Sequence, residues 1–256
     1  MSHTASRAEV ARLRELLRDR RARDHAGLFV AEGPRVLDAA LDHGAAIEAV
    51  YAAPEIPAVQ AVVARATAAG IDVVALDWKT AARIGDTVTP QPVFAVVRKP
   101  RPAPWGAVDL VVIGAPIGDP GNVGTLMRSA VAAGTQAIGL GAGSVDAYNP
   151  KVVRASAGAC FAIRIMEGEP AVNMLAALGA HGIRRIGAVA TGGSAPEALD
   201  FRAPVAFVLG HEAHGLAPDL PLDEMVTIPM AAGESLNVAM AGTVLLFEAA
   251  RQRRIS

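Results

Sequence analysis

Three short stretches of the chain combine glycine-containing turns with polar side chains that could bind a ligand. The polar residues are Asn122 and Arg128 in residues 118–128, Glu212 in residues 209–216, and Ser235 and Asn237 in residues 228–238. Arg128 falls at the edge of an apolar helix face near the start of a helix, so it is a candidate for contact with an anion or a substrate. A surface ion pair is the alternative for Arg128. Ser235 and Asn237 open a long apolar helix, where free backbone N–H groups suit a ligand. Alternatively, Ser235 only caps that helix.

Two other kinds of site are not supported by these stretches. His211, Glu212 and His214 suggest zinc by type, but their spacing is not that of a helical metalloprotease and no further ligand is evident. We therefore predict no metal. Gly118, Gly121 and Gly124 lack the Gly-x-Gly core of a dinucleotide fingerprint, which argues against a nicotinamide-dependent oxidoreductase.

The second half of the chain alternates apolar strands with helices. The expected strands are 110–115, 137–140, 163–166, 186–190, 206–209 and 226–230, and the expected helices are 122–133, 151–159, 172–180 and 236–250. Continuous apolar strands separated by helices predict a mostly parallel sheet that is covered on both faces. Ligands of such sheets bind at the carboxyl ends of the strands, where the three polar stretches fall.

The first half predicts a small three-layer α/β domain. The expected strands are 28–31, 47–52, 71–76 and 92–97, and the expected helices are 6–23, 34–43, 59–69 and 78–84. Pro100, Pro102 and Pro104 then interrupt the alternation, because three prolines in five residues cannot continue a helix or an inner strand. We therefore expect a first domain at 1–98, a linker at 99–104 and a second domain at 105–256.

Arginine is concentrated in the first predicted helix. Seven arginines against three acidic residues leave a local charge of about +4 within 6–23, although the whole chain has a net charge of −1. A solvated helix face is one interpretation. The other is contact with RNA phosphates, because the arginine fork matches phosphate oxygens. The arginines predicted to bind RNA are Arg18, Arg20, Arg21 and Arg23.

Composition limits the remaining classes of protein. The near-neutral charge gives no global basic field. The single cysteine, Cys160, excludes an intrachain disulfide and fits a reducing cytoplasm. The Arg-rich start is unlike a signal peptide, and the apolar run 236–250 is too short to span a membrane. A cytoplasmic protein is therefore expected.

The three stretches together resemble the ordered motifs of a known family. Asn122-x-Gly-x-x-x-Arg128, Leu209-Gly210-x-Glu212-x-x-Gly215-Leu216 and Ile228-Pro229-Met230 followed by Ser235-Leu236-Asn237 are similar to those of the SpoU (TrmH-type) RNA 2′-O-ribose methyltransferases of the SPOUT superfamily. The resemblance covers residues 108–252. The N-terminal hundred or so residues, with Gly27 to Gly33, resemble that family's ribosomal-protein-like substrate-binding domain.

This resemblance implies a C-terminal trefoil knot that forms a pocket for S-adenosylmethionine, and a homodimer. The implied cofactor-binding residues are Leu209, Gly210, Ile228, Met230, Leu236 and Asn237, and the implied catalytic residues are Asn122, Arg128, Glu212, Ser235 and Asn237. The sequence departs from the usual pattern at His211, His214 and Ala239, none of which is an implied catalytic residue.

The implied reaction needs these residue types. The 2′-hydroxyl is a poor nucleophile, so the enzyme must align it with the methyl donor and stabilise the developing alkoxide. Arg128 would stabilise that oxygen or the adjacent phosphate, while Asn122 and Ser235 would orient the ribose. Glu212 would fix either the Arg128 side chain or a backbone turn. The two-domain layout favours ribosomal RNA as the substrate. The alternatives are a transfer-RNA methyltransferase and a catalytically silent RNA-binding member.

Overall fold

The computed structural model describes residues 3–85, 91–101 and 105–255, and the chain clusters into two compact units. Unit 1 contains residues 1–101 and 148–161, and unit 2 contains residues 102–147 and 162–256. The division after Arg101 falls within the predicted linker, of which residues 102–104 lie outside the described residues. The sequence did not predict that residues 148–161 would group with unit 1.

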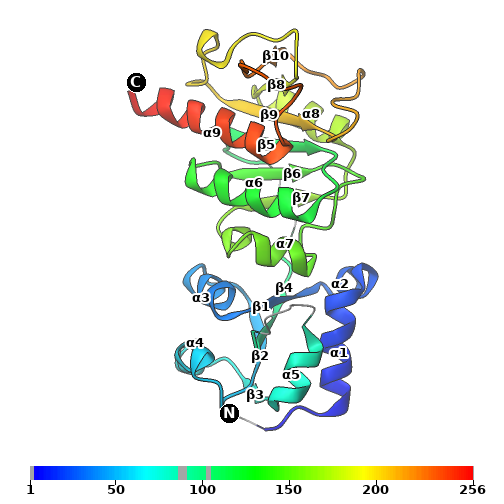
Figure 1. Ribbon diagram of the computed structural model, residues 1–256, viewed down its shortest axis with the longest axis vertical. Coiled ribbons are helices and arrows are strands. Elements are labelled where there is room, and N and C mark those ends of the chain that lie inside the picture. Colours follow the sequence, from blue (N-terminus) through cyan, green and yellow to red (C-terminus); the bar gives the residue numbers. More distant parts are fainter. Residues whose placement is uncertain (1–2, 86–90, 102–104, 256) are drawn as a thin grey trace. The chain divides into compact units, whose positions relative to one another are not determined.

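Unit 1 is built on a four-stranded mixed sheet (Figure 1). In spatial order its strands are β1 (Leu28–Glu32), β4 (Val93–Arg98), β2 (Ile47–Ala52) and β3 (Val73–Ala75). Strand β4 runs antiparallel to both of its neighbours, whereas β2 and β3 are parallel. The expected small α/β domain is therefore present in the structure.

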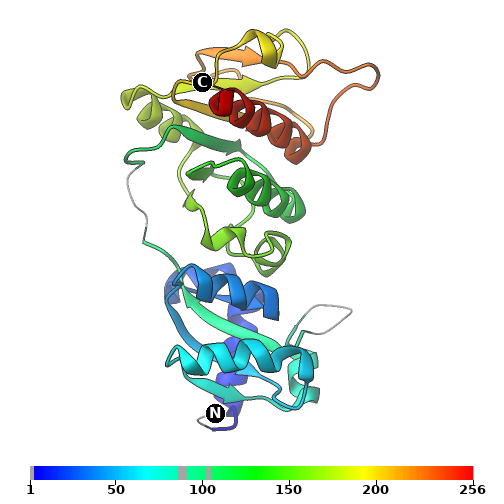
Figure 2. The same ribbon diagram turned by 90° about the vertical axis from the view of Figure 1, so that its left-hand side faces the viewer.

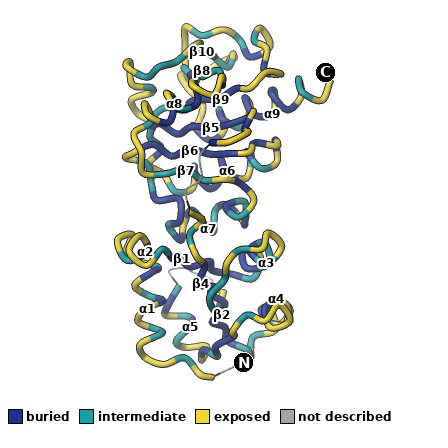
Figure 3. Tube along the Cα trace, turned by 180° about the vertical axis from the view of Figure 1, so that it is seen from behind, coloured by how far each residue is buried: buried dark blue, intermediate teal, exposed yellow. Residues whose placement is uncertain are grey.

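Helices cover both faces of this sheet, and Figure 3 shows the buried strands between them. Helices α1 (Arg7–Arg18) and α5 (Trp78–Ile84) cover one face, and α3 (Pro34–Asp42) and α4 (Pro57–Ala68) cover the other (Figure 1). The buried core under α1 and α5 includes Leu13, Leu16, Val30, Ile84, Phe94 and Val96. Since side chains alternate between the two faces of a strand, the intervening residues pack under α3 and α4.

The single helix predicted over residues 6–23 is wrong. Helix α1 ends at Arg18, and a second helix, α2 (Arg20–Ala26), follows it. Asp19 between them has an extended backbone, with φ −110° and ψ 118°, and its side chain accepts a hydrogen bond from the backbone N–H of Arg21 at 2.8 Å. A short acidic side chain that bonds the backbone locally favours a cap over a helix interior.

Residues 148–161 complete unit 1. They form helix α7 (Pro150–Ala155) and a short 3-10 turn, η1 (Ala159–Phe161), so the predicted helix over 151–159 is shorter than expected. The rings of Tyr148 and Phe161 lie 4.7 and 5.9 Å from the ring of Phe29 on β1. The Arg154 guanidinium also pairs with the buried carboxylate of Glu32 at 2.6 Å. This segment is therefore part of the unit 1 core.

Unit 2 is built on a six-stranded sheet in which every neighbouring pair is parallel. In spatial order its strands are β10 (Glu224–Val226), β8 (Arg184–Ala188), β9 (Val205–Gly210), β5 (Leu110–Ala115), β6 (Ala137–Leu140) and β7 (Arg164–Glu167). Helices α6 (Pro120–Ala132) and α9 (Val238–Ile255) cover one face, and α8 (Ala171–Ala180) covers the other (Figures 1 and 2). The parallel α/β sheet predicted from the sequence is confirmed.

Helix α9 is buried on one side only. Its buried residues are Val238, Ala239, Gly242, Leu245, Leu246, Ala249 and Ala250. A Cβ atom on Gly242 would lie 2.6 Å from Leu126 and 2.8 Å from Leu209, so the glycine lets α9 pack closely on α6 and β9. On the opposite side Met240, Val244 and Phe247 are 47%, 42% and 43% exposed. The apolar run of α9 is therefore only partly covered within the single chain.

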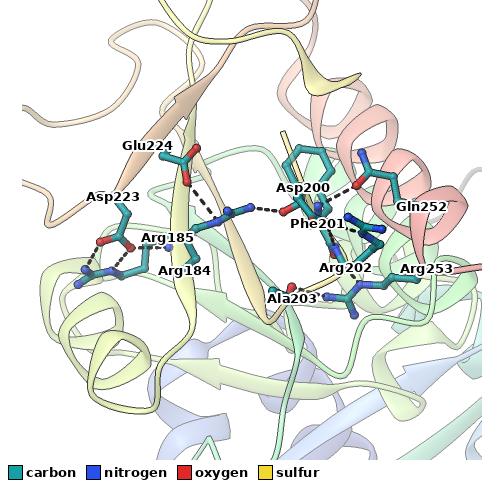
Figure 4. Close-up of polar contacts among 10 residues, drawn as sticks. All are labelled: Arg184, Arg185, Asp200, Phe201, Arg202, Ala203, Asp223, Glu224, Gln252 and Arg253. Atoms are coloured by element: carbon teal, nitrogen blue, oxygen red, sulfur yellow. Dashed lines mark hydrogen bonds and ion pairs between the residues drawn. The ribbon is translucent and has the colours of Figure 1, made fainter. Parts of the chain in front are cut away.

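Polar contacts fix the C-terminal end of α9, as Figure 4 shows. The Gln252 side chain accepts a hydrogen bond from the backbone N–H of Phe201 at 2.8 Å. Arg253 donates to the carbonyl oxygens of Phe201 at 2.9 Å and Ala203 at 3.1 Å. These contacts hold α9 against the segment that precedes β9. Within the part of the chain that the structure describes, neither α9 nor any other helix is long and apolar enough to cross a bilayer.

Candidate active site

The three polar stretches follow strands that end at the same edge of the unit 2 sheet. Residues 116–128 follow β5, residues 211–216 follow β9, and residues 227–237 follow β10. Strands β5 and β9 are direct neighbours, and all the strands are parallel. The first stretch turns into α6 through Asp119, whose carboxylate accepts from the backbone N–H of Asn122 at 2.8 Å.

A chain of side-chain hydrogen bonds joins the three stretches. The amide of Asn122 donates to Glu212 Oε1 at 3.0 Å, and the amide of Asn237 donates to Asn122 Oδ1 at 2.9 Å. Asn237 Oδ1 in turn accepts from the backbone N–H of Ala239 at 2.9 Å and of Met240 at 3.3 Å. Three of the five predicted catalytic residues therefore lie together, although 115 positions separate Asn122 from Asn237 in the sequence.

Asn237, not Ser235, caps α9. Its side chain bonds the first free N–H groups of the helix, which begins at Val238. The interpretation of Ser235 as an N-cap is therefore wrong. Ser235 is exposed at the edge of the pocket described below, and its side chain forms no hydrogen bond with another described residue.

Hydrogen bonds hold Glu212 in its charged form. Burial alone would raise the pKa of this carboxyl group. Bonds from its own backbone N–H, from the Asn122 amide and from the backbone N–H groups of Gly118 and Asp119 outweigh that effect and lower the pKa. Of the two roles predicted for Glu212, the contacts match the fixing of a backbone turn, since none of them involves Arg128.

These loops line a pocket of about 520 Å³. All six predicted cofactor-binding residues line it, namely Leu209, Gly210, Ile228, Met230, Leu236 and Asn237. Glu212 and Ser235 line it as well. Residues 188–190, at the end of β8 and directly after it, form a further wall that was not predicted from the sequence. They carry no polar side chain, but the parallel pairing of β8 with β9 brings them to the same edge.

A tight turn forms the part of the pocket that follows β9. The backbones of His211 and Gly215 exchange two hydrogen bonds, at 2.9 and 2.8 Å. A Cβ atom on Gly210 would lie 2.3 Å from the carbonyl carbon of Gly215, so only glycine fits there. The rings of His211 and His214 stack with centroids 4.9 Å apart. No group of three metal-ligating side chains occurs among the described residues, in this turn or elsewhere.

Arg128 does not join the hydrogen-bonded group. It is exposed on α6, does not line the pocket, and forms no ion pair or hydrogen bond with any other described residue. Its neighbour Ser129 bonds Thr243 on α9, Oγ to Oγ1, at 2.7 Å. The surface ion pair considered for Arg128 is therefore absent among the described residues.

The structure separates the four arginines predicted to bind RNA. Arg18 and Arg21 are exposed, and their side chains have no partner among the described residues. Arg20 pairs with Asp24 at 3.5 Å. Arg23 is only 2% exposed and donates to the carbonyl oxygen of Leu16 at 2.8 Å. The prediction of RNA contact is wrong for Arg23, because its guanidinium group is buried in unit 1.

Comparison with known proteins defines the class to which this fold and this site belong. The SpoU rRNA Methylase family model matches residues 109–247, and a model described as an MRM3-like substrate binding domain matches residues 8–95. The chain belongs to the SpoU family of RNA methyltransferases. The resemblance carried by the three motifs and by the N-terminal domain is thereby confirmed.

Individual relatives agree with this assignment. The 23S rRNA (guanosine(2553)-2′-O)-methyltransferase RlmP of Bacillus subtilis is 31% identical over 181 residues, which cover 70% of this chain and 72% of that protein. An uncharacterized tRNA/rRNA methyltransferase of Synechocystis is 36% identical over 179 residues, which are 67% of this chain and 65% of that protein. The SpoU methyltransferase AviRb of Streptomyces viridochromogenes, solved with AdoMet, superimposes with a TM-score of 0.85 at 27% identity. That match covers 97% of this chain and 100% of the solved one.

Proposed function

We propose that this protein transfers a methyl group from S-adenosylmethionine to a ribose 2′-oxygen in ribosomal RNA. The observation that carries the proposal is the hydrogen-bonded group of Glu212, Asn122 and Asn237 at the pocket, which unites the three family motifs. The names of RlmP and AviRb support methyl transfer, and RlmP acts on the 2′-oxygen of ribosomal RNA.

The pocket suits S-adenosylmethionine in size and in lining. Its volume lies within the usual range for small-molecule sites, about 300–1,000 Å³. Leu236 is 41% exposed at the pocket, which leaves an apolar surface for an adenine ring. The carboxylates of Glu212 and Glu234 give the lining a negative charge that suits a cationic sulfonium. The six residues that would hold the cofactor are those predicted from the family.

The side chains of this chain divide the catalytic work. When bound, S-adenosylmethionine supplies an activated methyl group that needs little acid assistance. Glu212 and Asn122 fix the turns after β9 and β5, and Asn237 fixes the start of α9. Ser235, whose hydroxyl is unbonded among the described residues, orients the ribose. Arg128 stabilises the developing alkoxide or the adjacent phosphate, because a guanidinium group stays protonated.

A homodimer would bring two further features together. The exposed side of α9, with Met240, Val244 and Phe247, is an apolar surface that a second copy can cover. Arg128 lies on α6, which packs beside α9, so the same contact would place this free arginine close to the partner.

We expect Phe247→Glu to give a monomer by sedimentation at micromolar concentration. Val172→Glu, at an equally exposed apolar residue of α8, is the matched control.

Substrate choice is assigned to residues 1–98 and chemistry to residues 105–256, joined by the linker at 99–104. The matched substrate-binding domain model over residues 8–95 supports this division. Arg18, Arg20 and Arg21 are the proposed surface contacts to RNA phosphates. The cytoplasm is the proposed location, as the single cysteine led us to expect.

Mapping 2′-O-methyl groups in RNA from cells with and without the gene tests the proposal. We expect one ribosomal RNA nucleotide to lose its methyl group in the absence of the gene. Loss from transfer RNA alone would replace the proposed substrate. If calorimetry shows no binding of S-adenosylmethionine and no RNA loses a methyl group, the protein is a silent RNA-binding member of the family.

A further inference from the structure

A second hollow, of about 380 Å³, lies in unit 1, far along the chain from the family motifs. One wall is formed by α1, with Arg7, Val10, Ala11 and Arg14. The opposite wall is formed by residues 75–77 and Thr80, where β3 passes into α5, and residues 4–5 close one end. We call this hollow the α1–α5 groove.

The groove is held open by fixed backbone. The N-terminal segment pairs with β3, since the N–H of Ala5 donates to Ala75 O and the N–H of Ala75 donates to His3 O, both at 2.8 Å. A capping box between Ser6 and Glu9 fixes the start of α1, which also packs on α5 through the unit 1 core. The walls therefore need no rearrangement to accept a ligand.

Two unpaired arginines flank the groove. Arg7 and Arg14 form no ion pair or hydrogen bond with another described residue, and they are seven positions apart on one helix. At about 1.5 Å rise per residue, two full turns place them about 10 Å apart along the axis. By contrast, Arg12 on the same helix is paired with Glu48.

The lining between the two arginines is mainly apolar. Val10, Ala11, Ala75 and Leu76 contribute aliphatic surface. The one carboxylate of the groove, Asp77, accepts from the backbone N–H of Thr80 at 2.9 Å as the cap of α5. A nucleobase, whose flat ring face can pack on aliphatic side chains, with a phosphate on either side matches this arrangement in both shape and charge.

We propose that the α1–α5 groove seats one unpaired nucleotide of the RNA substrate, with Arg7 and Arg14 binding the phosphates on its two sides. This inference rests on the proposed function, because it takes RNA as the ligand. It makes Arg7 and Arg14, on α1 beside a recessed surface, the principal RNA contacts in place of Arg18, Arg20 and Arg21.

The test measures binding of the full-length protein to a fluorescein-labelled single-stranded oligoribonucleotide of mixed sequence. Affinity is followed from about 50 to about 200 mM salt, where each phosphate contact to a single strand contributes about 0.7 to the logarithmic slope. Arg7→Ala with Arg14→Ala should lower the slope by about 1.4. The matched control is Arg12→Ala with Arg65→Ala, which removes the same charge from ion-paired arginines and should change the slope much less.

A third variant blocks the proposed nucleotide site in the α1–α5 groove without changing the charge of the protein. Ala11 is exposed within the groove, and Ala11→Phe fills the space while leaving both arginines in place. We expect the affinity to fall about tenfold with the slope unchanged, because the loss of one seated base is of that order. Unchanged affinity in Ala11→Phe, or equal slopes in the groove and control variants, would overturn the proposal.

Two further readouts separate this inference from the proposed function. Calorimetric binding of S-adenosylmethionine should equal wild type in all variants, and circular dichroism equal to wild type shows that the substituted unit 1 is folded. Methyl transfer to saturating RNA should likewise be preserved in the groove variants while KM for RNA rises. If wild type itself transfers no methyl group, the proposed function fails. If wild type is active and the groove variants have its KM, only the inference about the groove fails.

Discussion

The predicted catalytic residues of the unit 2 pocket and the arginines of the α1–α5 groove differ in how far their polar groups are already bonded. In the unit 2 pocket, Glu212, Asn122 and Asn237 bond one another and the surrounding backbone. In the α1–α5 groove of unit 1, Arg7 and Arg14 have no partner among the described residues. A reaction that requires atoms in line depends on groups fixed in advance. A polyanion instead requires charge that is not already neutralised.

The largest expected effect concerns Arg128, which forms no ion pair or hydrogen bond with another described residue. We expect Arg128→Ala to lower kcat about 10²- to 10³-fold, as loss of a transition-state contact does, while the Kd of S-adenosylmethionine stays within about twofold. Single-turnover methylation and calorimetry measure the two quantities. Arg202→Ala is the control, because Arg202 is paired with Asp200 on the surface. Turnover near wild type in Arg128→Ala would mean that methyl transfer does not require Arg128.

Within unit 1, a buried and a free arginine can be compared directly. Arg23→Ala leaves the Leu16 carbonyl oxygen without its side-chain donor, and we expect it to cost about 1–3 kcal/mol in the free energy of unfolding. Arg21→Ala removes an exposed side chain with the same charge and should stay within about 0.5 kcal/mol. Chemical denaturation of both variants makes the measurement. Equal losses would contradict the structural role assigned to Arg23.

One substitution can break the network of the pocket while keeping the helix cap. Asn237→Asp retains an oxygen for the N–H groups of Ala239 and Met240 but loses the amide that donates to Asn122. We expect S-adenosylmethionine to bind about tenfold more weakly, a change of about 1.4 kcal/mol, with thermal stability preserved. Asn237→Ala, which loses both functions, should also lower the Tm. An unchanged Kd in Asn237→Asp would show that the network does not shape the pocket.

The smallest expected effect is the pH dependence of cofactor binding. Because the pKa of folded Glu212 is lowered from its usual 4.5, its contribution is fully present above that value and is lost as pH falls through the lower folded pKa. Affinity for S-adenosylmethionine should therefore be flat from about pH 8 to about pH 5, with no acid limb from Glu212 in that window. Titration of Glu212→Gln beside wild type tests this. A limb near neutral pH that disappears in Glu212→Gln would reverse the assigned direction of the pKa shift.

The sequence predicted the parts of the fold that depend on local pattern. The apolar strands, the glycine turns and the three motifs lead to the parallel sheet and to the residues that line the pocket. The break at Asp19 and the burial of Arg23 were not predicted, because a run of arginines has the same helical pattern whether or not one side chain turns inward. The sequence suggested Ser235 as a possible cap, and Asn237 was not considered, for a similar reason. Either polar residue suits that position, and only the start of α9 at Val238 decides between them.

The course of the chain through unit 1 affects the order in which the protein can fold during synthesis. Tyr148 and Phe161 complete the core around Phe29, and Arg154 forms the ion pair with buried Glu32. The N-terminal hundred or so residues therefore emerge from the ribosome with part of their apolar surface uncovered, although domains generally fold from the N-terminus onward. Unit 1 can be completed only after residue 161 has emerged from the ribosome, and β5, α6 and β6 of unit 2 emerge before it. Completion of unit 1 thus waits for part of unit 2.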